Sequence, residues 1–310
     1  MLQEIARNKR RSVLVVIGFV VIWLGIGALL GALLGAGGSS GSEGSAIATG
    51  MVVAAIFAAM AVAFAIMSGG RLVLGVSGAH PADPHQYQRL HDVVDAMAIS
   101  AGIPKPDVYV IDDPSPNAFA TGISPNKAAI TATTGLLQIM NREELEGVVS
   151  HEMSHIKNYD VRLILIVTTL IGFAGILASL LWRSAFFMPR SRGRDGNQIA
   201  IFIFAAGALL TIVAFIVGPL IKFALSRSRE ELADVSGVNL TRNPLGLMHA
   251  LQKLQQNDQP FKGFNHASAA MCIDDPLQHH EGLAHRLFDT HPPLDERIAI
   301  LQKIASGQPA

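Results

Sequence analysis

Long uncharged runs of apolar residues alternate with charged segments along this chain of 310 residues. The apolar cores of these runs comprise residues 12–34, 46–67, 163–182 and 196–221. A membrane-spanning helix needs about 20 mostly apolar residues, so each run is long enough to span. Because unpaired backbone groups are costly in hydrocarbon, helix is the expected conformation of all four runs.

The placement of Lys and Arg predicts how these helices cross the membrane. The connector at residues 35–45 carries one acid and no base, whereas the chain before the first run is basic at Arg7, Lys9, Arg10 and Arg11. We therefore expect the N-terminus and the chain after the second run to lie inside the cell. The connector between the third and fourth runs is also basic, so a fully spanning hairpin and a shallower one both remain open.

The first run is expected to be a retained anchor, because the apolar core of a signal peptide is only about 7–15 residues long. Gly27, Gly31 and Gly35 recur in it every four residues, and small residues at this spacing let helices approach closely. Internal packing against another helix of the same chain explains the spacing, and a seam for a homo-oligomer is the alternative.

The remaining residues have the mixed pattern of a soluble α+β domain. Strands are predicted at 108–111 and 128–134, and helices at 84–100, from about 228, at 245–255 and at 294–304. Asn141 and Glu144 have the spacing of a capping box, which predicts a helix that begins there. We expect this helix to run on towards the third apolar run.

Composition agrees with a membrane protein that has a soluble part. Half of the residues are hydrophobic and only 15% are charged, whereas soluble domains carry roughly a quarter charged residues. Lys plus Arg equals Asp plus Glu at 24 each, so no overall field favours nucleic acid as a partner. Cys272 is the only cysteine, so no internal disulfide can form and no oxidising compartment is required.

The helix that begins at Asn141 carries the sequence HEMSH, which contains His151, Glu152 and His155. Residues four apart lie on one face of a helix, so both imidazoles can bind one ion, and neutral imidazole suits zinc. Glu152 can then act on a water at the ion without binding the ion itself. Random shuffling gives this pattern in on the order of one chain in a hundred, so a chance match on a solvated helix needs a second observation to exclude it.

A catalytic zinc site of this type needs a third protein ligand. The sequence SRSREELAD at residues 226–234 follows the fourth apolar run directly and supplies Glu230, Glu231 and Asp234. Spacing alone leaves Glu230 and Glu231 as rivals for the ligand role. Glu230 lies 75 residues after His155, and the hydrophobic hairpin between them explains how they meet, because both of its flanks return to one membrane face.

Several motifs in order make the chain resemble one family. They are PNAFATG at 116–122, TGLL at 134–137, the HExxH helix with a hydrophobic hairpin after it, RExxAD at 229–234 and THPP at 290–293. After two N-terminal spans, this order resembles the HtpX family of membrane-bound zinc metalloproteases, which are relatives of the CAAX prenyl proteases. The resemblance covers nearly the whole chain.

The resemblance implies the ligand set of gluzincin-type proteases. His151, His155 and Glu230 would hold one zinc ion per chain, with Glu152 as the catalytic residue. Asp234 is similar to the acid that hydrogen-bonds a ligand histidine and fixes its orientation. The family more often has an aromatic residue where this chain has Glu231, a departure that concerns local packing.

The implied architecture is an α+β, multi-span helical membrane protein with a mainly helical, zincin-like catalytic domain that carries a small β-sheet. Its expected parts are a membrane hairpin (residues 1–70), the first part of the catalytic domain with the HExxH helix (71–160), a second hydrophobic hairpin (161–225) and the second part of the catalytic domain (226–310). The implied activity is endoproteolysis of polypeptides, above all misfolded or damaged membrane proteins during stress, with self-cleavage. The implied location is the lipid bilayer of the inner membrane, with the catalytic domain on the cytoplasmic side.

Other residues carry signals with two explanations each. The resemblance brings His291 near the site, where it either stabilises the oxyanion or caps the last helix. Asn117 and the strand at 130–134 either pair with an extended substrate at a sheet edge or are structural. His279, His280 and His285 either form an accessory metal site or are exposed loop residues.

Two rival functions remain. A membrane scaffold or chaperone of the same fold would bind polypeptide without hydrolysis, but it has no need of a general base at Glu152. A transporter that carries the ion as cargo would need ionisable residues within its spans. The four apolar runs carry almost none, which disfavours the transporter.

Overall fold

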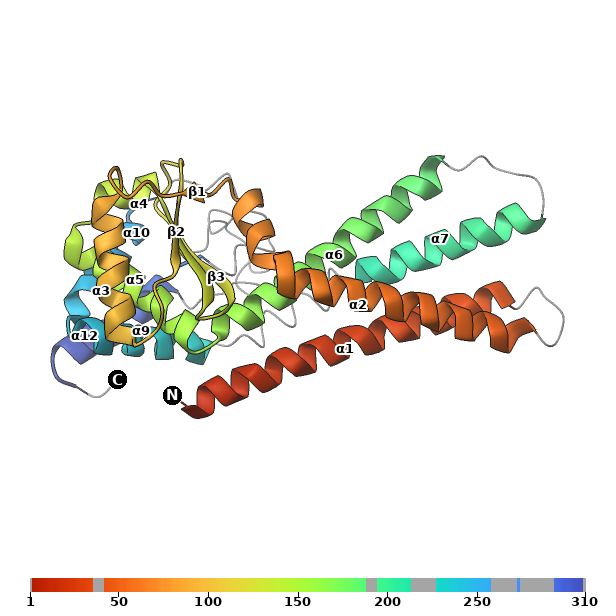
Figure 1. Cartoon of the computed structure of the whole chain (residues 1–310), viewed down its shortest axis with the longest axis horizontal. Helices are drawn as coiled ribbons and strands as arrows, with labels where there is room; N and C mark the ends of the chain where they lie inside the picture. The colour runs from red at the N-terminus through yellow and green to blue at the C-terminus, as the bar shows by residue number, and fades with distance from the viewer. Residues whose placement is uncertain are drawn as a thin grey trace. The chain divides into compact units, whose positions relative to one another are not determined.

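The computed structural model describes residues 2–35, 42–187, 194–212, 227–257, 272–273 and 293–308 (Figure 1). The elements in chain order are α1 (Leu2–Gly35), α2 (Ser42–Val76), β1 (His80–Pro81), α3 (Gln88–Ala101), β2 (Asp107–Ile111), β3 (Ala118–Ser124), β4 (Lys127–Thr133), α4 (Thr134–Ile139), α5 (Arg142–Lys157), α6 (Asp160–Phe187), α7 (Arg194–Ile212), α9 (Arg227–Thr241), α10 (Pro244–Gln255) and α12 (Leu294–Ala305). Helix predominates, with one small sheet, so the predicted fold class is confirmed.

The chain divides into two compact units. The sheet unit comprises Met1–Lys9, Ser68–Leu165 and Lys222–Ala310. The helix unit comprises Arg10–Met67 and Ile166–Ile221.

Among the described residues, three helical stretches are long and apolar enough to cross a membrane: Ile5–Ala32, Glu43–Val76 and Asp160–Arg183. They contain the second and third predicted apolar runs and all but the last two residues of the first. A shorter apolar stretch, Ile203–Ile212, covers part of the fourth run, and residues 213–221 lie outside the described residues. How deeply the second hairpin enters the membrane therefore stays a prediction.

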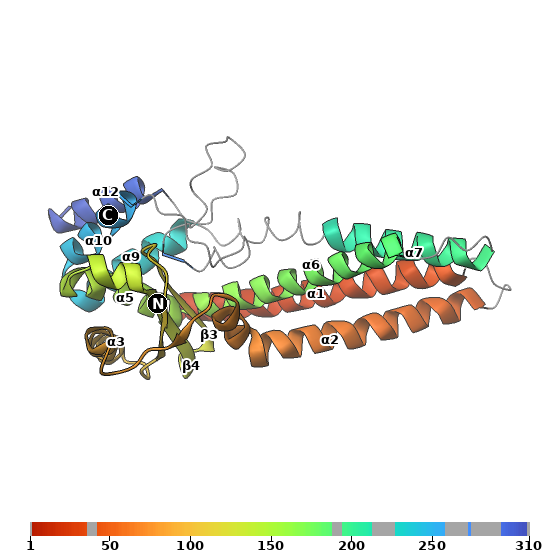
Figure 2. The ribbon, with the colours of Figure 1, turned by 90° about the horizontal axis from the view of Figure 1, so that it is seen from above.

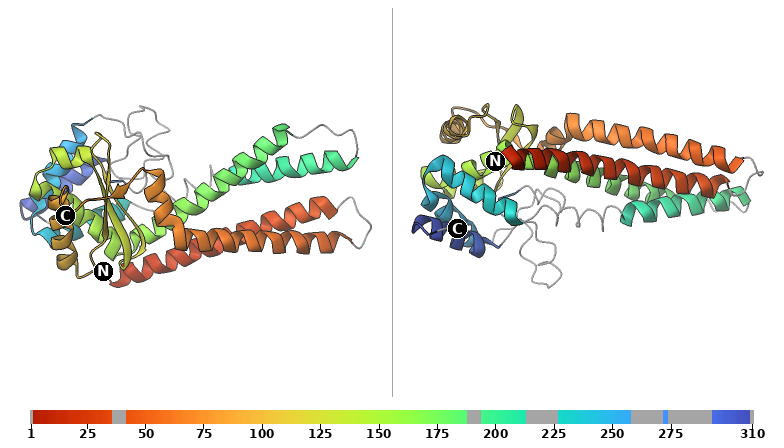
Figure 3. Two further views of the ribbon diagram at one scale, coloured as in Figure 1. Left: turned by 45° about the horizontal axis from the view of Figure 1, so that its top comes forward. Right: turned by 90° about the horizontal axis from the view of Figure 1, so that it is seen from below.

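In the helix unit, α1 runs alongside α2 (Figure 3). A Cβ added to Gly27 would lie 2.4 Å from the carbonyl oxygen of Gly50, and one added to Gly31 would lie 2.4 Å from that of Ala46. Helix backbones approach this closely only where side chains are missing. The glycine repeat of the first run therefore serves internal helix packing, which was one of the two interpretations of its spacing.

The described strands of the sheet unit form one four-stranded sheet in the order β1-β2-β4-β3. β2 and β4 are parallel, while β1 pairs with β2 and β3 with β4 in antiparallel fashion. β4 is thus central, and six of its seven residues are buried. The hypothesis that residues 130–134 offer a sheet edge to a substrate is wrong, because Ile130 pairs with Val108 on one side and Ala120 on the other.

β3 forms the edge beside β4, and the sequence patterns did not predict it. The available signal was the alternation of Phe119, Thr121 and Ile123, which favour strands, although glycine, present at Gly122, is depleted in them. Part of the edge is already paired, because Phe119 bridges Cys272 and the backbone N–H of Ile273 donates to the carbonyl oxygen of Ala118 at 2.9 Å.

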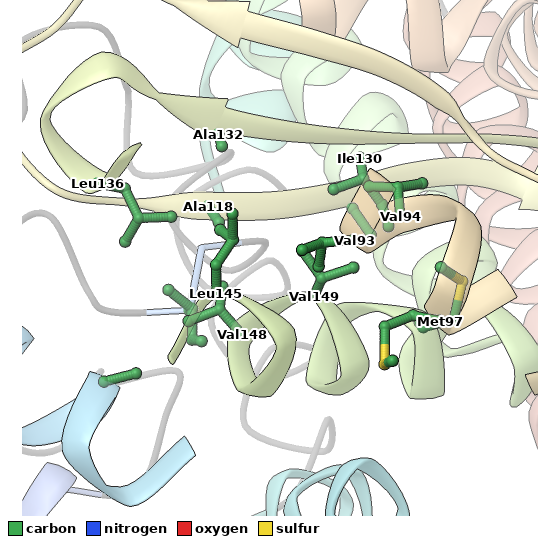
Figure 4. Close-up of a cluster of buried hydrophobic side chains, with 14 of the residues drawn as sticks. Val93, Val94, Met97, Ala118, Ile130, Ala132, Leu136, Leu145, Val148 and Val149 are labelled. Atoms are coloured by element: carbon green, nitrogen blue, oxygen red, sulfur yellow. The ribbon is translucent and has the colours of Figure 1, made fainter. Parts of the chain in front are cut away.

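Helix α5 lies between α3 on one side and α9 and α10 on the other (Figure 2). Figure 4 shows the core that α3 and α5 form with the sheet, in which the labelled side chains are Val93, Val94, Met97, Ala118, Ile130, Ala132, Leu136, Leu145, Val148 and Val149. On the other side, a Cβ on Gly147 would lie 2.5 Å from the backbone nitrogen of Leu247. Another on Gly237 of α9 would lie 3.0 Å from Oγ of Ser150. The first close approach is between α5 and α10, and the second lets α9 pack against the part of α5 that carries the HExxH motif.

The prediction that the HExxH helix runs on into the third apolar run is wrong. Helix α5 ends at Lys157 with Asn158 as its C-cap, and α6 begins at Asp160. Between them Tyr159 adopts the left-handed conformation with φ 62°, a conformation that breaks a right-handed helix. The break at 158–160 places Asp160 within reach of the second histidine of the motif.

Candidate metal centre

The two histidines of the motif lie on one face of α5, as their spacing predicts. The helix begins with the predicted capping box: the backbone N–H of Glu144 donates to Oδ1 of Asn141 at 2.9 Å, and that of Asn141 donates to Oε2 of Glu144 at 2.8 Å. One turn separates His151 from His155, whose Nε2 atoms lie 3.1 Å apart. Both side chains are buried.

Glu230 reaches the same point from the first turn of α9. Its Oε2 lies 3.4 Å from Nε2 of His151, and its Oε1 lies 3.5 Å from Nε2 of His155. Glu230 is buried, whereas the neighbouring Glu231 is exposed. Of the two acids that spacing left as rivals, the structure therefore brings Glu230 to the histidines.

Two carboxylates hold the other nitrogens of the rings. Oδ1 of Asp234 lies 2.8 Å from Nδ1 of His151, and Oδ2 of Asp160 lies 3.2 Å from Nδ1 of His155. A carboxylate accepts a hydrogen bond, so each ring carries its proton on Nδ1 when it is neutral. Both Nε2 lone pairs then point towards Glu230.

This donor set fits a zinc ion. Zinc–nitrogen bonds of about 2.0–2.1 Å in tetrahedral geometry put neighbouring ligand atoms about 3.3–3.4 Å apart. The three atom pairs here are 3.1, 3.4 and 3.5 Å apart. Two lone pairs and a carboxylate facing one another repel unless a cation lies between them.

The pKa of His151 reflects the same demand for positive charge. Burial and the nearby Arg297 charge lower this pKa, but the hydrogen bonds to Asp234 and Glu230 together with the charge of Asp234 raise it to about 9. Because proton and metal compete for the ring, metal binding releases the proton.

Comparison with known proteins identifies the family. The sequence model of Peptidase family M48 matches residues 84–305, which is most of the chain. The chain belongs to peptidase family M48. Since this is a family of metallopeptidases, the site described above belongs to a protein that requires a metal.

Relatives of this M48 peptidase carry the name protease HtpX homolog. The one from Lactobacillus helveticus is 40% identical over 310 residues, covering 97% of this chain and 99% of the relative. The one from Listeria monocytogenes is 37% identical over the same shares of the two chains. The one from Dictyoglomus turgidum is 44% identical over 239 residues, which is 77% of each chain. The predicted resemblance to the HtpX family is confirmed.

The crystal structure of S. mikatae Ste24p has a similar fold. The TM-score is 0.50 at 18% identity, and the match covers 79% of this chain and 57% of Ste24p. At this identity the likeness concerns the fold alone. With its apolar helices and its family, the chain is a membrane metallopeptidase, as the sequence analysis predicted.

The M48 site contains a buried arginine that the sequence analysis missed. Arg297 of α12 donates to Asp234 through Nε at 2.9 Å and Nη2 at 2.7 Å, and through Nη1 to the carbonyl oxygen of Ile273 at 3.1 Å. Burial lowers its pKa, but the charge and hydrogen bonds of Asp234, together with the charges of Glu230 and Glu152, raise it, so the guanidinium stays charged. The available signal was a charge at the apolar spacing of the last helix, between Leu294 and Leu301.

Asp234 is held in its charged form by this pair. Burial alone raises the pKa of a carboxyl group, but the Arg297 charge and the hydrogen bond to His151 lower the pKa of Asp234 below its usual value. The carboxylate therefore remains an acceptor for Nδ1 of His151. Asp234 was predicted from the resemblance to orient a histidine, and its contacts are those of such a residue.

Asp160 was also missed, because we expected an unbroken helix through residues 158–160. Its carboxylate is buried, and Oδ1 lies 3.8 Å from Nη1 of Arg229. Each histidine thus has a carboxylate partner on its Nδ1, one from α9 and one from the start of α6. The resemblance supplied only the first of these.

Glu152 is buried beside His151, with 2% of its surface exposed. Its carboxylate is near enough to Arg297 to contribute to the raised pKa of that residue. The general-base role of Glu152 stays a prediction. His291 and the group His279, His280 and His285 lie outside the described residues.

Asn117 has a structural environment in the described part of the chain. Its backbone N–H donates to Oγ1 of Thr133 at 2.9 Å, and its carbonyl oxygen accepts from the backbone N–H of Thr133 at 2.9 Å. Its Oδ1 accepts from the backbone N–H of Ala118. These contacts join the start of β3 to the end of β4, and a role for Asn117 in substrate binding stays a prediction.

Proposed function

We propose that this M48 peptidase is a zinc-dependent endopeptidase in which His151, His155 and Glu230 hold the ion and Glu152 is the general base. One observation carries the proposal. The Nε2 atoms of His151 and His155 lie 3.1 Å apart, and each has one carboxylate oxygen of Glu230 at 3.4 or 3.5 Å. Hydrogen bonds to Nδ1 fix both rings in the orientation that metal binding needs.

The side chains have separate tasks in peptide hydrolysis. Zinc, when bound, supplies Lewis acidity, which lowers the pKa of a water molecule to about 7 and polarises the scissile carbonyl. Glu152 takes the proton of the attacking water and delivers it to the leaving amine. Asp234 and Asp160 keep the imidazoles in the tautomer that leaves Nε2 free for the ion.

We further propose that the substrates are polypeptides, in particular misfolded or damaged membrane proteins. The names of the HtpX homologues and the apolar helices of this chain support this substrate class. The Lys and Arg residues before the first span, against a connector without them, support a cytoplasmic position of the catalytic residues at the inner membrane. Membrane proteins with damaged cytoplasmic segments would then be accessible to the site.

The experiment measures zinc content and casein cleavage on the full chain purified in detergent. The wild type is expected to bind one zinc ion and to cleave. Glu152→Gln is expected to keep the zinc and to lose roughly 10²–10⁴-fold in cleavage rate, the usual contribution of a general base. Replacement of the exposed Glu231 by Gln is the matched control and should change neither quantity.

Two results would contradict the proposal in different ways. A wild type that binds zinc but cleaves no polypeptide would support the scaffold or chaperone alternative. Cleavage by Glu152→Gln at the wild-type rate would remove Glu152 from the mechanism while leaving the metal site in place.

A further inference from the structure

An asparagine near the N-terminus is buried within the sheet unit. Asn8 lies in the first turns of α1 and is 1% exposed, whereas Arg7 and Lys9 on either side of it are exposed. Burial of an amide without hydrogen bonds costs a few kcal/mol, so the environment of Asn8 must supply partners. It does so at the break between α5 and α6.

The amide nitrogen of Asn8 makes two hydrogen bonds there. Nδ2 donates to the carbonyl oxygen of Asn158 at 2.9 Å and to Oδ1 of Asp160 at 2.7 Å. These partners lie 150 and 152 residues away in the chain. The first bond occupies a carbonyl at the end of α5, and the second binds the carboxylate that begins α6.

Asp160 connects this contact to the metal centre. While Oδ1 accepts from Asn8, Oδ2 lies 3.2 Å from Nδ1 of His155. An amide donor on one oxygen fixes the rotation of a carboxylate, and so fixes the direction of its other oxygen. Asn8, Asp160 and His155 therefore form a continuous hydrogen-bonded series that ends on a candidate zinc ligand.

A second contact attaches the same segment to the same break. The ammonium group of Lys9 lies 4.2 Å from the centre of the Tyr159 ring, a cation–π arrangement. Tyr159 is the residue in the left-handed conformation. Consecutive residues of the N-terminal segment thus contact all three residues of the break, 158–160.

We propose that the N-terminal segment in front of the first apolar run (residues 12–34) is a positioning element of the metal centre, and that Asn8 acts on His155 through Asp160. This inference rests on the proposed metal site. It extends the site to a part of the chain that the family match at 84–305 does not include. Zinc affinity should consequently depend on an intact N-terminal segment.

The test measures the affinity of the metal-free full chain for Zn²⁺ by competition with a chromophoric chelator at pH 8. Loss of a residue that hydrogen-bonds a metal ligand lowers metal affinity by about tenfold or more. For Asn8→Ala, whose effect is indirect, we expect a loss of about tenfold in zinc affinity. Asn8→Asp has the same shape but sets a carboxylate against Asp160, so a larger loss is expected. Gln3→Ala removes an exposed amide of the same helix and should leave affinity unchanged.

Two further measurements distinguish the proposed positioning role of Asn8 from a merely structural role. The absorption bands of bound Co²⁺ report ligand geometry, and they should shift in Asn8→Ala but not in Gln3→Ala. In a background of Asp160→Ala, the substitution Asn8→Ala should have less than about twofold further effect, because residues that act through one another are not additive.

Each outcome decides the matter. A wild type that binds no metal would overturn the proposed metal site together with this inference. If the wild type binds metal and both Asn8 variants bind it equally tightly, this inference alone would be overturned. A full tenfold effect of Asn8→Ala in the Asp160→Ala background would overturn it as well. If Asn8→Ala fails to fold, the isosteric Asn8→Asp variant provides the same test.

Discussion

The interiors of the two units of this protein are stabilised by different kinds of contact. The interior of the sheet unit contains buried charges, among them Asp160, Glu230, Asp234 and Arg297. In the helix unit, the described core consists of side chains such as Phe19, Trp23 and Ala58, and its helices approach at glycines. Charge and hydrogen bonding set the geometry of one unit, while shape sets that of the other.

This difference follows from what each unit must do. A metal site needs ligands fixed in direction, and direction comes from hydrogen bonds to each ring nitrogen. A membrane anchor needs only close packing, since lipid provides no hydrophobic force that drives helices together. Lost charge pairing should therefore be most costly around the candidate metal site of the sheet unit, whereas the helix unit should be destabilised mainly by added volume.

The largest effect is expected from Arg297→Met. This substitution leaves the buried carboxylate of Asp234 without its cation, and breaking a buried pair in this way costs about 3–5 kcal/mol. The free energy of unfolding of the full chain in detergent, with the release of zinc as the signal, measures the effect. Arg142→Met is the matched control, because Arg142 forms an exposed pair with Glu146 and such pairs contribute about 0.3–0.5 kcal/mol. Equal losses in the two variants would contradict the assignment of Arg297 to a charged interior.

A smaller effect is expected from Asp234→Asn, which removes the charge that orients His151. Zinc affinity should fall roughly 10–100-fold, which corresponds to about 1.4–2.8 kcal/mol. Asp160→Asn should have a smaller effect, because its oxygen lies 3.2 Å from the imidazole nitrogen, against 2.8 Å for Asp234. Chelator competition on both variants measures the difference. The reverse order would mean that distance does not rank the two carboxylates.

The same contrast explains what the sequence could predict. The HExxH pair and the capping box at Asn141 depend on spacing within one helix, so the sequence predicted both. The apolar runs depend on composition over about 20 residues, and the structure has helices at all of them within the described residues. Glu230 was distinguished from Glu231 only by resemblance, because both acids fit the spacing.

The missed residues depend on contacts between distant segments. Arg297 comes to the site from a helix 63 residues after Asp234, and Asp160 reaches His155 only because Tyr159 breaks the helix. Nothing in the local pattern requires that break, since Asn158, Tyr159 and Asp160 are all tolerated in helices. The strand β3 was missed for a different reason, since glycine is depleted in strands and Gly122 lies within the alternation of Phe119, Thr121 and Ile123.

The smallest effect is expected from added volume in the helix unit. Gly27→Ala places a methyl group 2.4 Å from the carbonyl oxygen of Gly50, and overpacking of this kind costs about 1–3 kcal/mol. The gain in helix propensity from glycine to alanine, about 1 kcal/mol, offsets part of this cost. Gly18→Ala in the same helix is the control, because its Cβ would have no neighbour within 4 Å, so only the gain remains.

The two glycine variants should therefore shift the unfolding of the chain in opposite directions, Gly27→Ala downwards and Gly18→Ala slightly upwards. Neither should change zinc affinity, because the contacts that orient the two proposed ligand histidines lie within the sheet unit. Thermal unfolding in detergent and chelator competition on the same samples measure both quantities. A loss of zinc affinity in Gly27→Ala without any loss of stability would mean that α1 packing transmits strain to the metal centre, and the division of tasks between the two units would then be wrong.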